Sequence, residues 1–198
     1  MAYWILKLEN DMDHDSISQI KPAAGDTPLV VLFRHNLWAN LRLIDACAAL
    51  DTAQSAVTMT GTYGSIFDTL HHIARAEQSY LGILTGRPPE TRLRLDRATN
   101  MVEIQEQARL AGEGLIAYAA GVAPSDVGYS DDDEDENLVW PIPAGMLLTQ
   151  VINHATEHRA QIMTILTQQG IEPPDLSGWK FMDHTTTVTP IPRPKPAE

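Results

Sequence analysis

The chain has 198 residues, a net charge of −12 and a single cysteine. The acidic balance argues against nucleic acid as a partner, because binding to phosphates needs a cationic surface. One cysteine excludes an intramolecular disulfide framework and a Cys-rich zinc site. No apolar run approaches the ~18 residues of a membrane span, and the N-terminus lacks the long apolar region of a signal peptide. We therefore expect a single globular domain, without a membrane contact, in the cytoplasm.

The N-terminal part is predicted to be an irregular leader over residues 1–27, followed by a helix over residues 29–50. Asp26-Thr27-Pro28 supplies a capping residue and a proline in the first turn. Asn36 and Asn40 lie on the core side of this helix and need partners if buried. They could hydrogen-bond a metal ligand or contact a substrate; equally, they could bond each other or the backbone in the core. Cys47 lies on the apolar side and is interpreted as a small core residue.

A second helix is predicted over residues 62–84, and it carries His71 and His72. It ends at a glycine followed by two prolines, which stop a helix. The helical periodicity places neither histidine at the centre of the apolar arc. His72 shares a face with small residues that would suit the wall of a cavity, whereas His71 lies on the other side. Periodicity therefore favours His72 only slightly as a ligand donor.

A third helix is predicted over residues 100–120, where Gly112 and Gly114 weaken the middle but allow close helix packing. Between it and the last helix we expect a short β-like excursion whose tip holds six acids, residues 131–136. This run lacks the alternating ligands and the glycine of an EF-hand calcium loop, and like charges repel one another into solvent. The sequence thus predicts a solvated loop there.

The fourth helix, predicted over residues 143–169, carries two histidines four positions apart, His154 and His158. Residues with this spacing lie on one face of a helix, about 6 Å apart at Cβ, so both rings can reach one metal ion. They fall in a stripe with apolar residues, which predicts that both face the core: Leu147, Val151, Ile162 and Ile165. A buried imidazole needs a partner. A metal would satisfy both rings, but core histidines bonded to neighbours or water fit the spacing equally well.

These pieces together resemble the DinB/YfiT-like superfamily of four-helix metal-binding proteins. The resemblance covers about residues 28–182 and rests on three motifs in order: Arg34-His35-Asn36-Leu37-Trp38-Ala39-Asn40, Leu70-His71-His72-Ile73-Ala74-Arg75-Ala76-Glu77, and His154-Ala155-Thr156-Glu157-His158-Arg159-Ala160-Gln161. In the family pattern the donor of the second helix stands directly before an aliphatic residue and five before a glutamate. His72, Ile73 and Glu77 fit this frame, and His71 does not. The family usually has glycine where this chain has Ala160.

The resemblance implies an all-α, up-down-down-up four-helix bundle with one divalent metal held by His72, His154 and His158. Residues 28–182 would form this domain, and residues 183–198 a Pro-rich tail. An all-imidazole site suits zinc or nickel, and also iron or copper, better than magnesium or calcium. Zinc would lower the pKa of a bound water toward ~7, or it could bind a thiolate. Glu77 is the nearest candidate general base, with an exposed surface glutamate as the alternative. Glu157 and Arg159 are predicted to be surface or interface ion-pair residues.

Three functions remain open at this point. The first is a metal-dependent enzyme acting on small molecules, either a hydrolase or a transferase or isomerase that uses a low-molecular-weight thiol, as the resemblance implies. The second is a noncatalytic, stress-associated metal-binding protein, and the third is a bundle without metal. The resemblance also predicts a homodimer. The helices favour the same prediction, because each needs only one buried face and they are rich in apolar residues.

Overall fold

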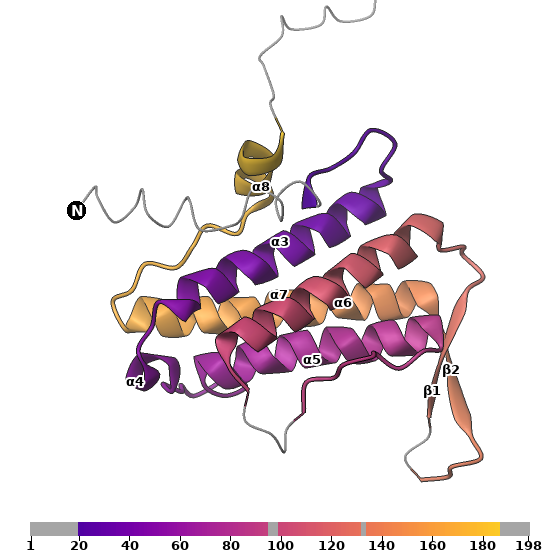
Figure 1. Cartoon of the computed structure of the whole chain (residues 1–198), viewed down its shortest axis with the longest axis horizontal. Helices are drawn as coiled ribbons and strands as arrows, with labels where there is room; N and C mark the ends of the chain where they lie inside the picture. Colours follow the sequence, from indigo (N-terminus) through magenta and orange to yellow (C-terminus); the bar gives the residue numbers. More distant parts are fainter. Residues whose placement is uncertain (1–19, 95–98, 132–133, 187–198) are drawn as a thin grey trace, which may run out of the picture.

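The protein is a bundle of four long helices (Figure 1), seen in a computed structural model that describes residues 20–94, 99–131 and 134–186. The long helices are α3 (Pro28–Ala48), α5 (Ile66–Thr85), α6 (Met101–Gly121) and α7 (Ala144–Gln168). Two short helices, α4 (Thr52–Ser55) and α8 (Gly178–Thr185), accompany them. Strands β1 (Val127–Asp131) and β2 (Val139–Pro143) form an antiparallel hairpin between α6 and α7. The predicted all-α bundle with a β-like excursion before its last helix is confirmed, whereas α4 and α8 were not predicted.

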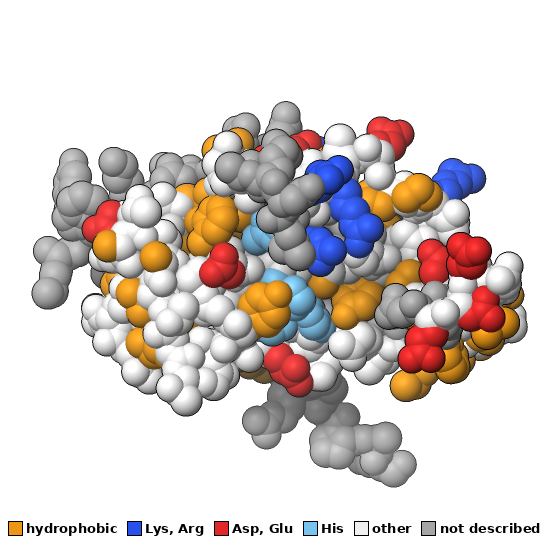
Figure 2. All heavy atoms as spheres, turned by 90° about the horizontal axis from the view of Figure 1, so that it is seen from below, with side chains coloured by type: hydrophobic (Ala, Val, Ile, Leu, Met, Phe, Trp, Pro, Cys, Tyr) orange, Lys and Arg blue, Asp and Glu red, His pale blue; other side chains and the backbone are white. Residues whose placement is uncertain are grey.

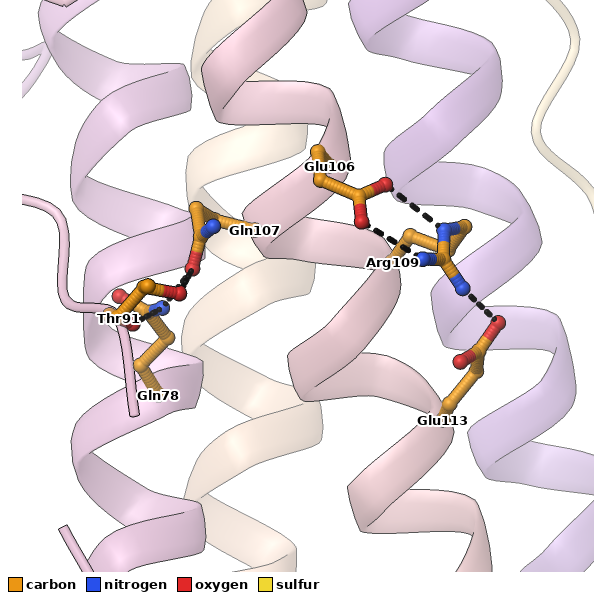
Figure 3. Close-up of polar contacts among 6 residues, drawn as sticks. All are labelled: Gln78, Thr91, Glu106, Gln107, Arg109 and Glu113. Atoms are coloured by element: carbon orange, nitrogen blue, oxygen red, sulfur yellow. Dashed lines mark hydrogen bonds and ion pairs between the residues drawn. The ribbon is translucent and has the colours of Figure 1, made fainter. Parts of the chain in front are cut away.

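Helices α5 and α6 run in one direction, and α3 and α7 run in the other (Figure 1). This up-down-down-up order requires a crossover from the end of α5 back to its start, where α6 begins. Hydrogen bonds fasten the crossover to both helices (Figure 3). Nε2 of Gln78 on α5 donates to the carbonyl of Thr91 in the crossover, at 2.8 Å, and the hydroxyl of Thr91 donates to Oε1 of Gln107 on α6, at 3.1 Å. Nε2 of Gln78 also donates directly to Oε1 of Gln107, at 2.6 Å. The crossover thus holds α5 and α6 side by side.

Side-chain caps set where the helices begin. Thr27 accepts a hydrogen bond from the amide of Val30, and Pro28 follows it, as the sequence predicted for the first helix. Helix α5 begins four residues later than predicted, because Ser65 is its cap and accepts from the amide of Asp68. The residues before Ser65 therefore form a turn instead of a helix. This turn places Tyr63 beside the histidine cluster described below.

Small residues let the helices approach closely at the centre of the bundle. A Cβ atom on Gly112 of α6 would collide with the side chain of Leu37 on α3, and one on Gly114 would collide with Leu81 on α5. These contacts agree with the predicted role of both glycines. On the outer side of α6, Arg109 bonds the carboxylates of Glu106 and Glu113, at 2.7 and 2.6 Å (Figure 3). Such exposed pairs contribute little, about 0.3–0.5 kcal/mol each.

The segments on either side of the bundle pack against it where they are described. Ile20, within the predicted leader, is buried in the main hydrophobic core. Phe181 of α8 packs edge-on against the ring of His35 and tilted against Trp38, with centroids 5.5 Å apart in both cases. Helix α8 continues to Thr185, into the predicted Pro-rich tail. Residues 1–19 and 187–198 lie outside the described residues.

The acidic run also agrees with its prediction where it is described: residues 131 and 134–136 are exposed. Across the described part of the chain, no helix has both the length and the apolar character that crossing a membrane would require.

Candidate metal centre

Three histidines from two antiparallel helices converge on one point. His72 comes from α5, and His154 and His158 come from α7. One nitrogen of each ring lies within 4.8 Å of the others, so the three could hold a single metal ion. Nε2 of His154 and Nε2 of His72 are 2.9 Å apart. The three histidines predicted as ligands thus lie together, and the member of this cluster from α5 is His72, not His71.

The two histidines of α7 lie at the edge of its core-facing side, not at its centre as predicted. Both rings are half-buried, while Ala155 and Arg159 take the buried positions at their level. The apolar residues of the predicted stripe are buried, but the histidines lie at the margin of this buried face and not within it. The rings therefore reach the surface of the bundle, where Figure 2 shows a patch of histidine side chains. A metal held there would remain accessible to a small molecule.

Gln161 and Tyr63 hold the rings in place. Oε1 of Gln161 accepts two hydrogen bonds, from Nδ1 of His158 at 3.0 Å and from the backbone amide of Tyr63 at 2.9 Å. A proton on Nδ1 leaves the lone pair of His158 on Nε2, which is the tautomer that a metal ligand needs. The Tyr63 ring stacks on His72, with centroids 4.0 Å apart. The sequence predicts a role for neither residue. Tyr63 is expected inside the second helix, and Gln161 belongs to the third motif without a predicted contact.

The surroundings of His72 and His154 favour the neutral form of both rings. Burial lowers the pKa of His72, and the neighbouring charges of His158, Arg75 and His71 lower it further. Burial, followed by repulsion from His158 and His72, lowers the pKa of His154 to about 4. Neutral imidazole is the form that binds a metal, so no protons need to be removed from these two rings at neutral pH.

The donor set fits a transition metal ion. Imidazole nitrogens bind zinc at about 2.0–2.1 Å, which in a tetrahedral site places two of them about 3.3 Å apart. The 2.9 Å between His72 and His154 is slightly shorter, so their rings need to separate by only a few tenths of an ångström. Nδ1 of His154 is buried and bonds no other described residue. The other nitrogen of this ring, Nε2, faces the cluster and makes the ring's polar contact. Three such ligands leave at least one coordination position open.

Glu77, Asn36 and Asn40 form a buried network with Arg159. Oε1 of Glu77 accepts from both asparagine amides, each at 2.8 Å. Their side-chain oxygens in turn accept from Nη1 of Arg159, at 2.7 Å for Asn36 and 2.6 Å for Asn40. The network ties α3, α5 and α7 together, and Arg159 follows His158 directly in the chain. It therefore fixes the helix that carries two of the three histidines.

These contacts correct two predictions. Arg159 was expected at the surface, but it is 5% exposed, because the polar network compensates for its burial. The alternative that Glu77 is an exposed glutamate is also wrong, since none of its surface is accessible. Burial raises the pKa of Glu77, although the Asn36 and Asn40 amides and the charge of Arg159 oppose this shift. Asn36 and Asn40 bond buried side chains of other helices, not each other.

His71 is more buried than His72, yet it does not join the cluster. Its ring bonds the backbone of Arg94 in the crossover. Burial alone would thus have selected His71, whereas the family frame selects His72, the residue that lies in the cluster.

A comparison with family models assigns the chain to a protein family. The model of the DinB family matches residues 24–194. The chain belongs to the DinB family. A comparison with curated proteins found no match. The histidines that the DinB frame singles out in the sequence are the same three that converge in the structure.

A pocket begins at the histidine cluster of this DinB protein. Its volume is about 430 Å³, and it is lined by residues of α5 and the preceding turn: Tyr63, Gly64, Asp68, His71, His72 and Arg75. Pockets of this size accept small molecules. Figure 2 shows a cluster of Lys and Arg side chains directly beside the histidine patch.

Proposed function

We propose that the protein is a metal-dependent enzyme acting on small molecules, in which a low-molecular-weight thiol is activated at the three-histidine centre for transfer to, or isomerisation of, a substrate. The observation that carries this proposal is the convergence of three imidazoles next to a pocket of about 430 Å³. A purely structural site has four protein ligands and no access, whereas three ligands and a pocket leave room for a reactant.

The chain's own residues supply the orientation of the site. His72, His154 and His158 would hold the ion, which is zinc or nickel in this proposal. Gln161 keeps the lone pair of His158 on Nε2, and Tyr63 covers one face of His72. When bound, the metal would act as a Lewis acid that lowers the pKa of a thiol or a water. Because all three protein ligands are neutral, an anionic fourth ligand is favoured at the centre.

The test uses cobalt in place of the native metal, because a thiolate bound to cobalt gives a strong near-ultraviolet charge-transfer band. Millimolar thiols of the glutathione or cysteine type are added from about pH 6 to 9, a range that approaches the free thiol pKa. We expect the band to appear and to strengthen as the pH rises. An unchanged spectrum over the whole range would contradict thiol activation and leave hydrolysis or simple metal binding.

Turnover is tested separately from binding. The zinc-loaded and nickel-loaded proteins are incubated with a thiol and an electrophilic small molecule, with and without a chelator. We expect consumption of the thiol that the chelator abolishes. Thiol binding without any turnover would favour a noncatalytic metal-binding protein.

A further inference from the structure

We infer that the small-molecule ligand of this centre carries a carboxylate group, which Arg75 binds in the pocket next to His72. This inference rests on the proposed function and specifies its substrate class. It starts from the position of Arg75, which follows His72 by three residues on α5. Residues with this spacing are neighbours on a helix surface, about 5–6 Å apart at Cβ. Both side chains line the same pocket.

Arg75 differs from Arg34 and Arg109 in having no ion pair with a carboxylate of the described residues. The net charge of the chain is −12, so carboxylates are abundant. Arg34 and Arg109 pair with acidic neighbours at 2.6–2.7 Å. Among the residues that the structure describes, however, no carboxylate forms an ion pair with Arg75. An unpaired cation at the wall of a pocket attracts an anion.

A second arginine extends the positive surface along α5. Arg92, in the crossover, donates from Nη2 to Oγ of Ser79 at 2.9 Å, and Ser79 lies one turn beyond Arg75. Ser79 in turn donates to the carbonyl of Arg75 at 3.1 Å. The crossover thus places a further guanidinium on the same side of α5, in agreement with the cluster of basic side chains in Figure 2. Cationic groups therefore continue from the pocket away from the histidines.

Asp68 sets the direction of the ligand. It lines the pocket one turn before His72, on the side opposite to Arg75, and its Oδ2 accepts a hydrogen bond from the hydroxyl of Ser65 at 2.6 Å. A ligand carboxylate near Asp68 would be repelled, and one near Arg75 would be attracted. The ligand would thus place its metal-binding atom at the histidines and extend along α5 toward Arg75. A guanidinium binds a carboxylate through two parallel hydrogen bonds, which gives orientation as well as affinity.

The experiment compares two probes that differ only in charge. The cobalt-loaded protein is titrated with 3-mercaptopropionate and with 3-mercaptopropionamide, at equal concentrations of thiolate, and the dissociation constants are read from the charge-transfer band. The 2- and 4-carbon acid–amide pairs are measured in the same way, because they vary the distance between the thiol and the carboxylate. We expect the best acid to bind about ten- to a hundredfold more tightly than its amide, as for a hydrogen bond between charged groups.

Variants then assign the preference to Arg75. Arg75→Gln should reduce the ratio of acid affinity to amide affinity to near one without weakening binding of the amide. Arg75→Lys should retain part of the preference, since lysine keeps the charge but lacks the planar guanidinium that forms two parallel hydrogen bonds. Arg87→Gln is the matched control, because it removes the same charge from an exposed residue just beyond the C-terminal end of α5. Its ratio should remain that of the parent protein. Circular dichroism and cobalt content establish that each variant is folded and loaded.

The outcomes separate this inference from the proposed function. Acids and amides that bind equally well would overturn the role of Arg75 while leaving thiol activation in place. A preference that survives in Arg75→Gln would also overturn it. If neither acids nor amides change the cobalt spectrum, the proposed function fails, and the carboxylate site that rests on it fails as well.

Discussion

Replacing Glu77 with alanine should destabilise the bundle by about 3–5 kcal/mol, the cost of breaking a buried charged network by removing one partner. The carboxylate accepts two amide hydrogen bonds at 2.8 Å, and bonds to a charged group contribute about 1.5–3 kcal/mol each. Its loss would leave two buried amide groups without an acceptor. It would also leave the buried cation of Arg159, which bonds the same two asparagines, without a counter-charge.

Urea unfolding followed by circular dichroism measures this loss, with Glu90→Ala as the control, because Glu90 is an exposed glutamate. The control should change the free energy of unfolding by less than ~0.5 kcal/mol. Glu77→Gln should cost less than Glu77→Ala, since it keeps an acceptor for both amides and burial already raises the pKa of Glu77. A loss below ~1 kcal/mol for Glu77→Ala would refute the structural role. The predicted catalytic role is tested with Glu77→Gln, where lost turnover in a stable, metal-loaded protein would support it.

Three further predictions concern other parts of the molecule. Burial lowers the pKa of His35 below its unfolded value of about 6.5. The stability that the neutral ring provides is therefore present above pH ~6.5 and is lost as the pH falls through the lower folded pKa. NMR titration should show a midpoint below 6.5, and a midpoint above it would contradict the burial argument. Burial raises the pKa of the Cys47 thiol to about 12, so a thiol reagent at pH 8 should label it slowly in the native protein and rapidly in urea; rapid native labelling would contradict its core position. The predicted homodimer has a suitable surface in an apolar groove of about 410 Å³ between α3 and α7, which includes Leu29, Leu32 and Leu148; light scattering at micromolar concentration should give the mass of two chains, and the mass of one chain would refute it.

The sequence predicted the four long helices because their apolar residues recur with the helical period and their ends carry clear signals, such as Thr27-Pro28 and Gly86. Periodicity could not choose between His71 and His72, because neighbouring residues on a helix point in different directions and both lay off the apolar arc. The resemblance selected His72, and His72 is the residue of α5 that lies in the histidine cluster.

Arg159 was misplaced for a physical reason. A charged residue is usually exposed, and its burial depends on partners from α3 and α5 that are far away in the sequence. The same holds for Tyr63, which reaches His72 and Gln161 only because the turn before α5 lies against α7. Gln161 differs, since it bonds His158 three residues away on the same helix. Local patterns define the helices, but they do not show which polar groups those helices bring together.

The metal content of protein purified without a histidine tag tests the central claim, that His72, His154 and His158 share one divalent ion. The structure offers a matched pair for this measurement, because His71 and His72 are adjacent but only His72 joins the cluster. We expect about one metal per chain in the parent protein and in His71→Ala. His72→Ala, His154→Ala and His158→Ala should lose most of it while remaining helical. One metal per chain in a variant that lacks all three histidines, or its loss from His71→Ala alone, would contradict the account.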